Sequence, residues 1–234
     1  MLEAEFKGLK LMDEINAVRV PRPFLSGKTD TISYLVVEAL ELKPHNQASQ
    51  EKLGRQLARL HLAEGPSEFG LDFDNTIGLT PQVNPWTSSW VEFYRKYRLE
   101  FQLEKIEEKY GDAELLKKSE KLLDRLPELF EGLEIRPSLL HGDLWGGNTA
   151  SIPGGDPVVY DPACYWGHHE ADLGMTGMFG GFTSAFFDAY HEAIPKQPGF
   201  EERNKLYELY HYLNHYLLFG GAYRNRCLSL LDSY

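Results

Sequence analysis

A short segment, LLHGDLWGGN at residues 139–148, holds the side chains with the clearest capacity for chemistry. Asp143 follows His141 by two residues, and Asn148 follows Asp143 by five. The carboxylate of Asp143 could accept a hydroxyl proton, and the amide oxygen of Asn148 could bind a divalent cation. Asp161 ends the apolar run PVVYD and could hold the same cation. One base and two oxygen ligands suit phosphoryl transfer, which depends on an oriented nucleophile and neutralised phosphate charge.

Each of these residues also has an ordinary structural explanation. A lone Asp before a turn is commonly a cap, and an Asn in a Gly-rich loop is commonly there for its left-handed conformation. The combined spacing, together with a predicted strand before Asp161, favours the chemical interpretation. We expect His141 to hold the loop by hydrogen bonds. Glu170 and Asp172 are expected to brace that loop rather than bind a metal.

The composition excludes several classes of protein. The chain has 234 residues, a formal net charge of −11 and dispersed Lys and Arg, which argues against a nucleic-acid partner. Its apolar runs are too short to cross a bilayer, and no secretory signal is evident. Cys164 and Cys227 do not make a disulfide framework. We therefore expect a cytoplasmic globular protein without a membrane partner.

The residue pattern predicts an α+β chain in two unequal parts. Residues 1–43 contain a helix at 2–12, strands at 23–28 and 31–40, and a hinge near 38–43. Residues 44–234 are mostly helical, with a loop-like stretch at 70–85. The helices predicted there are 47–62, 89–110, 113–133, 183–194 and 200–231, the last interrupted near Gly220 and Gly221.

The motifs resemble one family of sugar kinases. HGDLWGGN followed by YDPACYWGHHEADLGMTGMFGGF is similar to the fructosamine-3-kinase (ketosamine-3-kinase) family, within the wider aminoglycoside phosphotransferase and choline kinase group. HGDLxxxN alone would indicate only the wide group. FDNTIG, PQVNPW and PGFEERNKLYELYHYLNH narrow the resemblance, which covers residues 5–223. It implies a protein-kinase-like fold with a small N-terminal lobe and a mainly helical C-terminal lobe.

That resemblance also implies an activity, cofactors and site residues. The activity is ATP-dependent phosphorylation of the sugar 3-hydroxyl of ketosamines, either fructosamines or ribulosamines, carried on proteins or small amines. Asp143 would be the general base, and Asn148 and Asp161 would hold Mg²⁺. The backbone of Glu38, Ala39 and Leu40 would meet adenine. The implied contacts to the substrate are Trp145, Asn75, Thr76 and His215.

One feature of the family pattern is missing from the sequence. Kinases of this fold place a Gly-rich loop and an ATP-binding lysine on strands before the helix that here carries Glu5. The small lobe is therefore expected to be truncated, with an exposed strand edge that could allow self-association. Two alternatives stay open. One is a weakly active or non-catalytic fragment that binds ligand, and the other is an aminoglycoside- or choline-type phosphotransferase.

Overall fold

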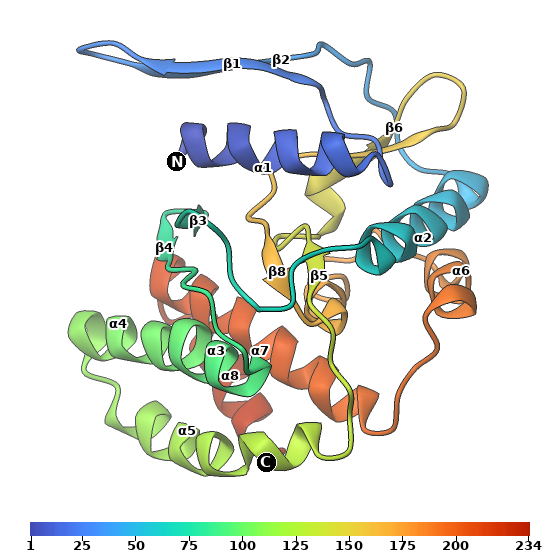
Figure 1. The fold of residues 1–234 in the computed structure, drawn as a ribbon. Helices are drawn as coiled ribbons and strands as arrows, with labels where there is room; N and C mark the ends of the chain where they lie inside the picture. The colour runs from blue at the N-terminus through green and yellow to red at the C-terminus, as the bar shows by residue number, and fades with distance from the viewer.

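The N-terminal part consists of one helix and one hairpin. In the computed structural model, which describes residues 1–234, α1 (Leu2–Ile15) is followed by β1 (Pro23–Lys28) and β2 (Ser33–Val37). The helix runs three residues beyond the predicted end and stops where Asn16 takes a left-handed conformation, with φ of 53°. The hairpin lies over α1 along the top of Figure 1. The predicted helix and two strands are thus confirmed as elements.

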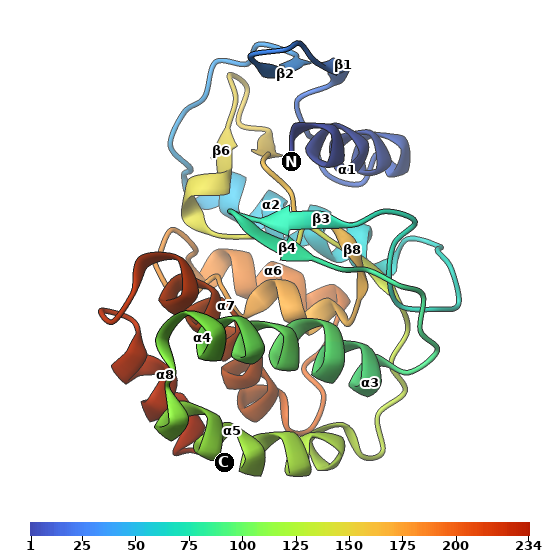
Figure 2. The same cartoon turned by 90° about the vertical axis from the view of Figure 1, so that its left-hand side faces the viewer.

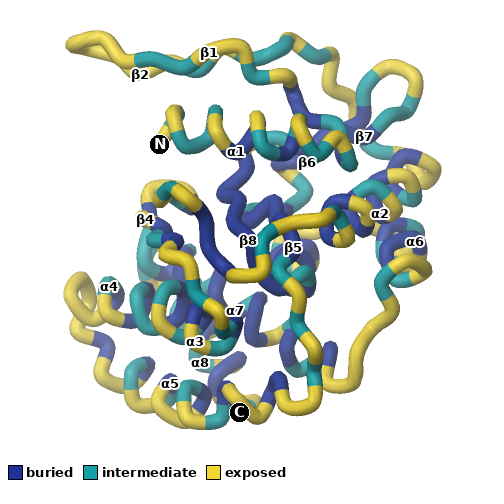
Figure 3. Tube along the Cα trace, in the orientation of Figure 1, coloured by how far each residue is buried: buried dark blue, intermediate teal, exposed yellow.

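The β1–β2 sheet has only two strands, and one face is open. Leu35 and Val37 pack toward the core, whereas Phe24, Ile32 and Val36 are exposed. Figure 3 shows this hairpin in exposed and intermediate colours, without a buried stretch. The exposed strand edge expected from the sequence is therefore present, and exposed apolar side chains lie beside it.

Two helices from distant parts of the sequence pack closely together. α2 (Gln47–Leu62) begins with a capping box between Asn46 and Ser49, and it packs on α6 (Ser184–Ala193). Gly54 permits this approach, because a Cβ there would lie 2.2 Å from the carbonyl oxygen of Phe186. Both helices match the ranges predicted from the sequence.

Three short antiparallel pairs of β-strands lie between the N-terminal hairpin and the C-terminal helices. They are β3 (Asn75–Ile77) with β4 (Thr80–Gln82), β5 (Ser138–Leu140) with β8 (Tyr165–Gly167), and β6 (Thr149–Ser151) with β7 (Pro157–Val159). The description of residues 70–85 as loop was therefore wrong for β3 and β4. Gly78, with φ of 58°, makes the tight turn between them, and buried side-chain hydrogen bonds hold the strands in place.

The C-terminal body is helical, as predicted. It contains α3 (Trp90–Tyr94), a π-helical turn, α4 (Phe101–Tyr110), α5 (Ala113–Arg125), α7 (Phe200–Phe219) and α8 (Arg224–Leu231). The segment predicted as helix to residue 133 changes to a 3₁₀ turn at Leu126–Phe130, which contains Pro127. Figure 2 shows these helices below the short strands, with α1 and the β1–β2 hairpin above.

No helix of this fold combines the length and the apolar character required to cross a membrane.

Candidate active site

The loop between β5 and β6 carries the predicted catalytic residues. Gly142 takes a φ of 81°, and a Cβ there would lie 2.1 Å from the carbonyl oxygen of Ala163, so only glycine fits this approach. His141 is fully buried, and its Nε2 contacts the carbonyl oxygen of Tyr160 at 3.0 Å. Its Nδ1 accepts a hydrogen bond from the backbone N–H of Asp143. The prediction that His141 holds the loop by hydrogen bonds is confirmed.

A buried carboxylate braces the same loop from behind. Asp172 accepts hydrogen bonds from the backbone N–H groups of His141 and Gly142, both at 2.7 Å, and from Nε2 of His61 at 3.0 Å. Burial raises the pKa of Asp172, but hydrogen bonding and charge from His61 outweigh this and leave that pKa below its ordinary value. Asp172 is thus an ionised acceptor that fixes the start of the loop, as predicted.

Glu170 has a different role from the one predicted. Its two carboxylate oxygens pair with Nε and Nη2 of Arg203 at 2.7 and 2.8 Å, and both side chains are buried. Glu170 therefore ties the segment after β8 to α7 and makes no hydrogen bond to the loop of residues 141–148. Sequence spacing could not separate it from Asp172, because the two residues lie only two positions apart.

Oxygen atoms from three residues converge at the loop. The amide nitrogen of Asn148 donates to the backbone oxygen of Asp143 at 3.0 Å and to its Oδ2 at 3.2 Å, which leaves Oδ1 of Asn148 without a partner in the chain. Asp161 follows β7 in a left-handed conformation, with φ of 57°, and is exposed. Burial and the nearby charge of Asp161 raise the pKa of Asp143 to about 7. These hard oxygen donors suit Mg²⁺, whose charge would offset that repulsion.

Asp143 and Asp161 line a cavity of about 250 Å³ at the junction of α1, the β3–β4 hairpin and the loop. Glu5 of α1 lines the same cavity, and burial together with Asp161 raises the pKa of Glu5. No Lys or Arg side chain lines it. The cavity is therefore acidic, and a divalent cation bound there would offset this charge toward a phosphate.

Asn75 and Thr76, two of the predicted substrate contacts, line this cavity from β3. The Asn75 amide is held on several sides: it donates to the backbone oxygen of Cys164 at 2.7 Å and accepts from Gln82 and Asn84. Its orientation is therefore fixed by the protein. The roles of both residues toward a substrate stay predictions.

Trp145 and His215, the other two predicted contacts, lie apart from that cavity in an aromatic group. The rings of Trp145 and His215 flank Phe179, with centroid distances of 5.5 and 5.2 Å. Gly147 leaves room for the indole, since a Cβ there would lie 2.2 Å from it. Phe179, which is 46% exposed, was missed as a site residue. The two glycines that follow Phe179 in MFGGF are the sequence feature that could have indicated a tight loop at this position.

The proposed adenine-binding segment follows β2 directly. Glu38 is held in place because its carboxylate pairs with Arg19 and accepts from the backbone N–H of Arg22. The backbone N–H and C=O groups of Ala39 and Leu40 make no hydrogen bonds within the chain. These groups are therefore free to meet a nucleotide base, although that role remains a prediction.

A buried histidine on α7 makes stability depend on pH. Burial and nearby His215 lower the pKa of His211 to about 3, and its Nδ1 has no hydrogen-bond partner. The unfolded chain binds a proton at this side chain below a pH of about 6.5, whereas the folded chain does not, so stability falls as the pH drops. His211→Leu should therefore gain about 1.3 kcal/mol relative to wild type between pH 7.5 and 5.5. Urea unfolding at both pH values measures this, and parallel curves would contradict it.

Comparison with known proteins agrees with this geometry. The family model described as "Fructosamine kinase" matches residues 1–234. A protein-ribulosamine 3-kinase from Oryza sativa subsp. japonica is 48% identical over 236 residues, which cover 100% of this chain and 68% of the relative. A ketosamine-3-kinase from Mus musculus is 41% identical, covering 99% of this chain and 82% of the relative.

Solved structures give the same assignment at the level of the fold. A crystal structure of a candidate fructosamine-3-kinase from Haemophilus somnus 129PT superposes with a TM-score of 0.89 at 30% identity, covering 100% of this chain and 79% of that one. Choline kinase LicA from Streptococcus pneumoniae superposes with a TM-score of 0.67 at 15% identity, covering 100% of this chain and 81% of that one, which supports the protein-kinase-like fold alone. With the family model matching the whole chain, this protein belongs to the fructosamine kinase family of phosphotransferases.

Proposed function

We propose that this protein transfers the terminal phosphoryl group of ATP to the 3-hydroxyl of a ketosamine. The observation that carries the proposal is the position of Asp143, a largely buried carboxylate that faces an acidic cavity beside Asn148 and Asp161. Relatives that share 41–48% of this sequence are described as ribulosamine or ketosamine kinases, which supports this choice of substrate.

Each site residue has a separate role in this reaction. Asp143 orients the substrate hydroxyl and accepts its proton as the phosphoryl group leaves ATP. Asn148 and Asp161 would hold Mg²⁺, which supplies positive charge to the phosphate oxygens. The backbone of Ala39 and Leu40 would receive adenine, with Glu38 fixing that segment through Arg19.

The sugar and its amine have complementary surroundings. The indole face of Trp145 suits the apolar face of a sugar, and His215 and Phe179 extend the same aromatic group. Thr76 and Asn75 lie in the wall of the cavity at Asp143. The secondary amine of a ketosamine is cationic at neutral pH, and Glu5 adds negative charge to the wall of the same cavity.

One observation favours a second candidate, a ligand-binding protein with little turnover. The cavity at Asp143 has no Lys or Arg in its lining. Loss of a charged contact to a transferred group typically costs about 10²–10³-fold in rate. Binding of nucleotide and ketosamine would then persist while transfer is slow.

A transfer assay separates these candidates. The purified chain is incubated with radiolabelled ATP, Mg²⁺ and either a ribulosamine, a fructosamine, choline or an aminoglycoside. We expect label on the ketosamines alone, and none when EDTA replaces Mg²⁺. Labelling of choline or the aminoglycoside would refute the substrate assignment. Ketosamine binding without labelling, measured by calorimetry on the same preparation, would establish the second candidate.

A further inference from the structure

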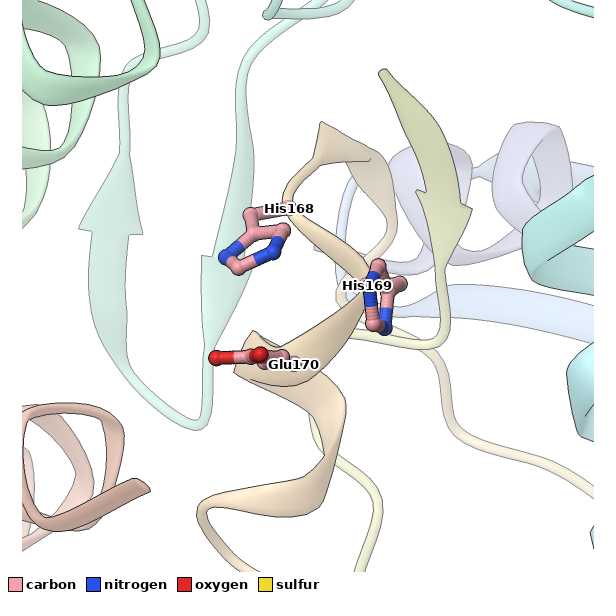
Figure 4. A group of neighbouring side chains, drawn as sticks. All are labelled: His168, His169 and Glu170. Atoms are coloured by element: carbon pink, nitrogen blue, oxygen red, sulfur yellow. The ribbon is translucent and has the colours of Figure 1, made fainter. Parts of the chain in front are cut away.

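Three consecutive residues after β8 form a cluster that resembles a metal site. One possible ligand atom from each of His168, His169 and Glu170 lies within 4.8 Å of the other two. Figure 4 shows the three side chains. However, Arg203 occupies both carboxylate oxygens of Glu170, at 2.7 and 2.8 Å. A buried guanidinium beside the cluster also opposes a bound cation. These groups are therefore better explained as hydrogen-bonding partners of the surrounding core.

One hydrogen-bonded chain leads from this cluster to the catalytic loop. Nδ1 of His169 lies 3.0 Å from the hydroxyl of Tyr190, which lies 2.8 Å from Nδ1 of His61. Nε2 of His61 contacts Asp172, which accepts from the backbone N–H groups of His141 and Gly142. Tyr190 comes from α6 and His61 from α2, and both side chains are buried. This series of hydrogen bonds therefore ends at Gly142, one residue before Asp143.

The carboxylate of Asp172 only accepts, so Nε2 of His61 carries a proton. Nδ1 of His61 shares a hydrogen bond with the hydroxyl of Tyr190, and that hydroxyl also bonds Nδ1 of His169. Burial lowers the pKa of His169 to about 3, so that His169 is neutral. Tyr190, His61 and Asp172 are therefore each held on both sides by a hydrogen bond.

We propose that Tyr190 is a positioning residue for phosphoryl transfer, acting through His61 and Asp172 on the backbone that precedes Asp143. The proposal rests on the role of Asp143 given above. The hydroxyl of Tyr190 fixes the ring of His61, the ring fixes the carboxylate of Asp172, and the carboxylate fixes two backbone N–H groups. Small displacements of a catalytic group lower the rate strongly, so loosening this chain reduces turnover without removing a substrate contact.

Tyr190→Phe removes only the hydroxyl and therefore tests this series of hydrogen bonds. We expect kcat on a ketosamine to fall about tenfold, while KM for ATP and for the ketosamine stays within about twofold. The amide proton resonances of His141 and Gly142, which report their bonds to Asp172, should shift in the NMR spectrum. Tyr97→Phe is the matched control, because Tyr97 is partly exposed and its hydroxyl makes no hydrogen bond. Tyr97→Phe should leave kcat and the amide proton resonances of His141 and Gly142 unchanged.

His169→Gln provides a second variant if Tyr190→Phe does not fold. It alters the donor to Tyr190 but keeps the hydroxyl, so we expect a smaller fall in kcat and a smaller shift of the same two amide protons. Unchanged kcat in folded Tyr190→Phe protein, or amide resonances that do not move, would overturn the proposal. If wild type transfers no phosphate to any ketosamine, the proposed function fails. The amide resonances of His141 and Gly142 still decide whether the chain positions the loop.

Discussion

Asp143→Asn should abolish transfer while making the metal-free protein more stable. The variant keeps the size of the side chain but cannot accept the substrate proton, so we expect kcat to fall by about 10³-fold or more. Burial and Asp161 raise the pKa of Asp143 to about 7, so the ionised carboxylate destabilises the folded chain at pH 8. Removing that charge should raise the free energy of unfolding by about 2–4 kcal/mol in EDTA at pH 8.

The pH dependence of this stability gain follows from the sign of the shift. The folded wild type binds a proton at Asp143 below about pH 7, whereas the unfolded chain does so only near pH 4. The advantage of the variant should therefore shrink as the pH falls from 8 to 5. Asp188→Asn, at an exposed position of α6, is the control and should alter neither activity nor stability. Residual transfer above about a tenth of wild type would refute the assignment of Asp143 as the base.

The position of the loop that carries Asp143 could be predicted from the sequence because its geometry is local. Gly142 and the spacing from Asp143 to Asn148 determine how the backbone turns between β5 and β6. The helices were equally predictable from their apolar periodicity, and the ends of α4 and α7 coincide with Gly111 and Gly220.

The contacts that complete the site depend on residues far apart in the chain, which spacing does not reveal. Asp172 reaches His61 across 111 positions, and Phe179 meets His215 on α7. Glu5 enters the cavity only because α1 lies over the β3–β4 hairpin and the loop. The β3–β4 hairpin itself was missed, because its strands are three residues long and are stabilised by buried amide side chains rather than by alternating apolar residues.

Arg203→Met should cost more stability than removal of any surface ion pair. Arg203 is buried and satisfies both oxygens of Glu170 as well as the carbonyl oxygen of Pro198.

Removing Arg203 leaves a buried carboxylate without its partner, and the expected loss is about 3–5 kcal/mol at pH 7.5. Burial already raises the pKa of Glu170, and removal of the guanidinium raises it further. The loss of stability should therefore diminish toward pH 5 as Glu170 takes up a proton.

Urea unfolding of Arg203→Met, Glu170→Gln and the double variant measures this coupling, and the double variant should be more stable than the sum of the single losses predicts. Arg226→Met, which removes an exposed ion pair with Glu208, should cost less than about 1 kcal/mol. A loss at Arg203 no larger than that at Arg226, or one independent of pH, would show that the pair contributes no more to stability than a solvent-exposed one.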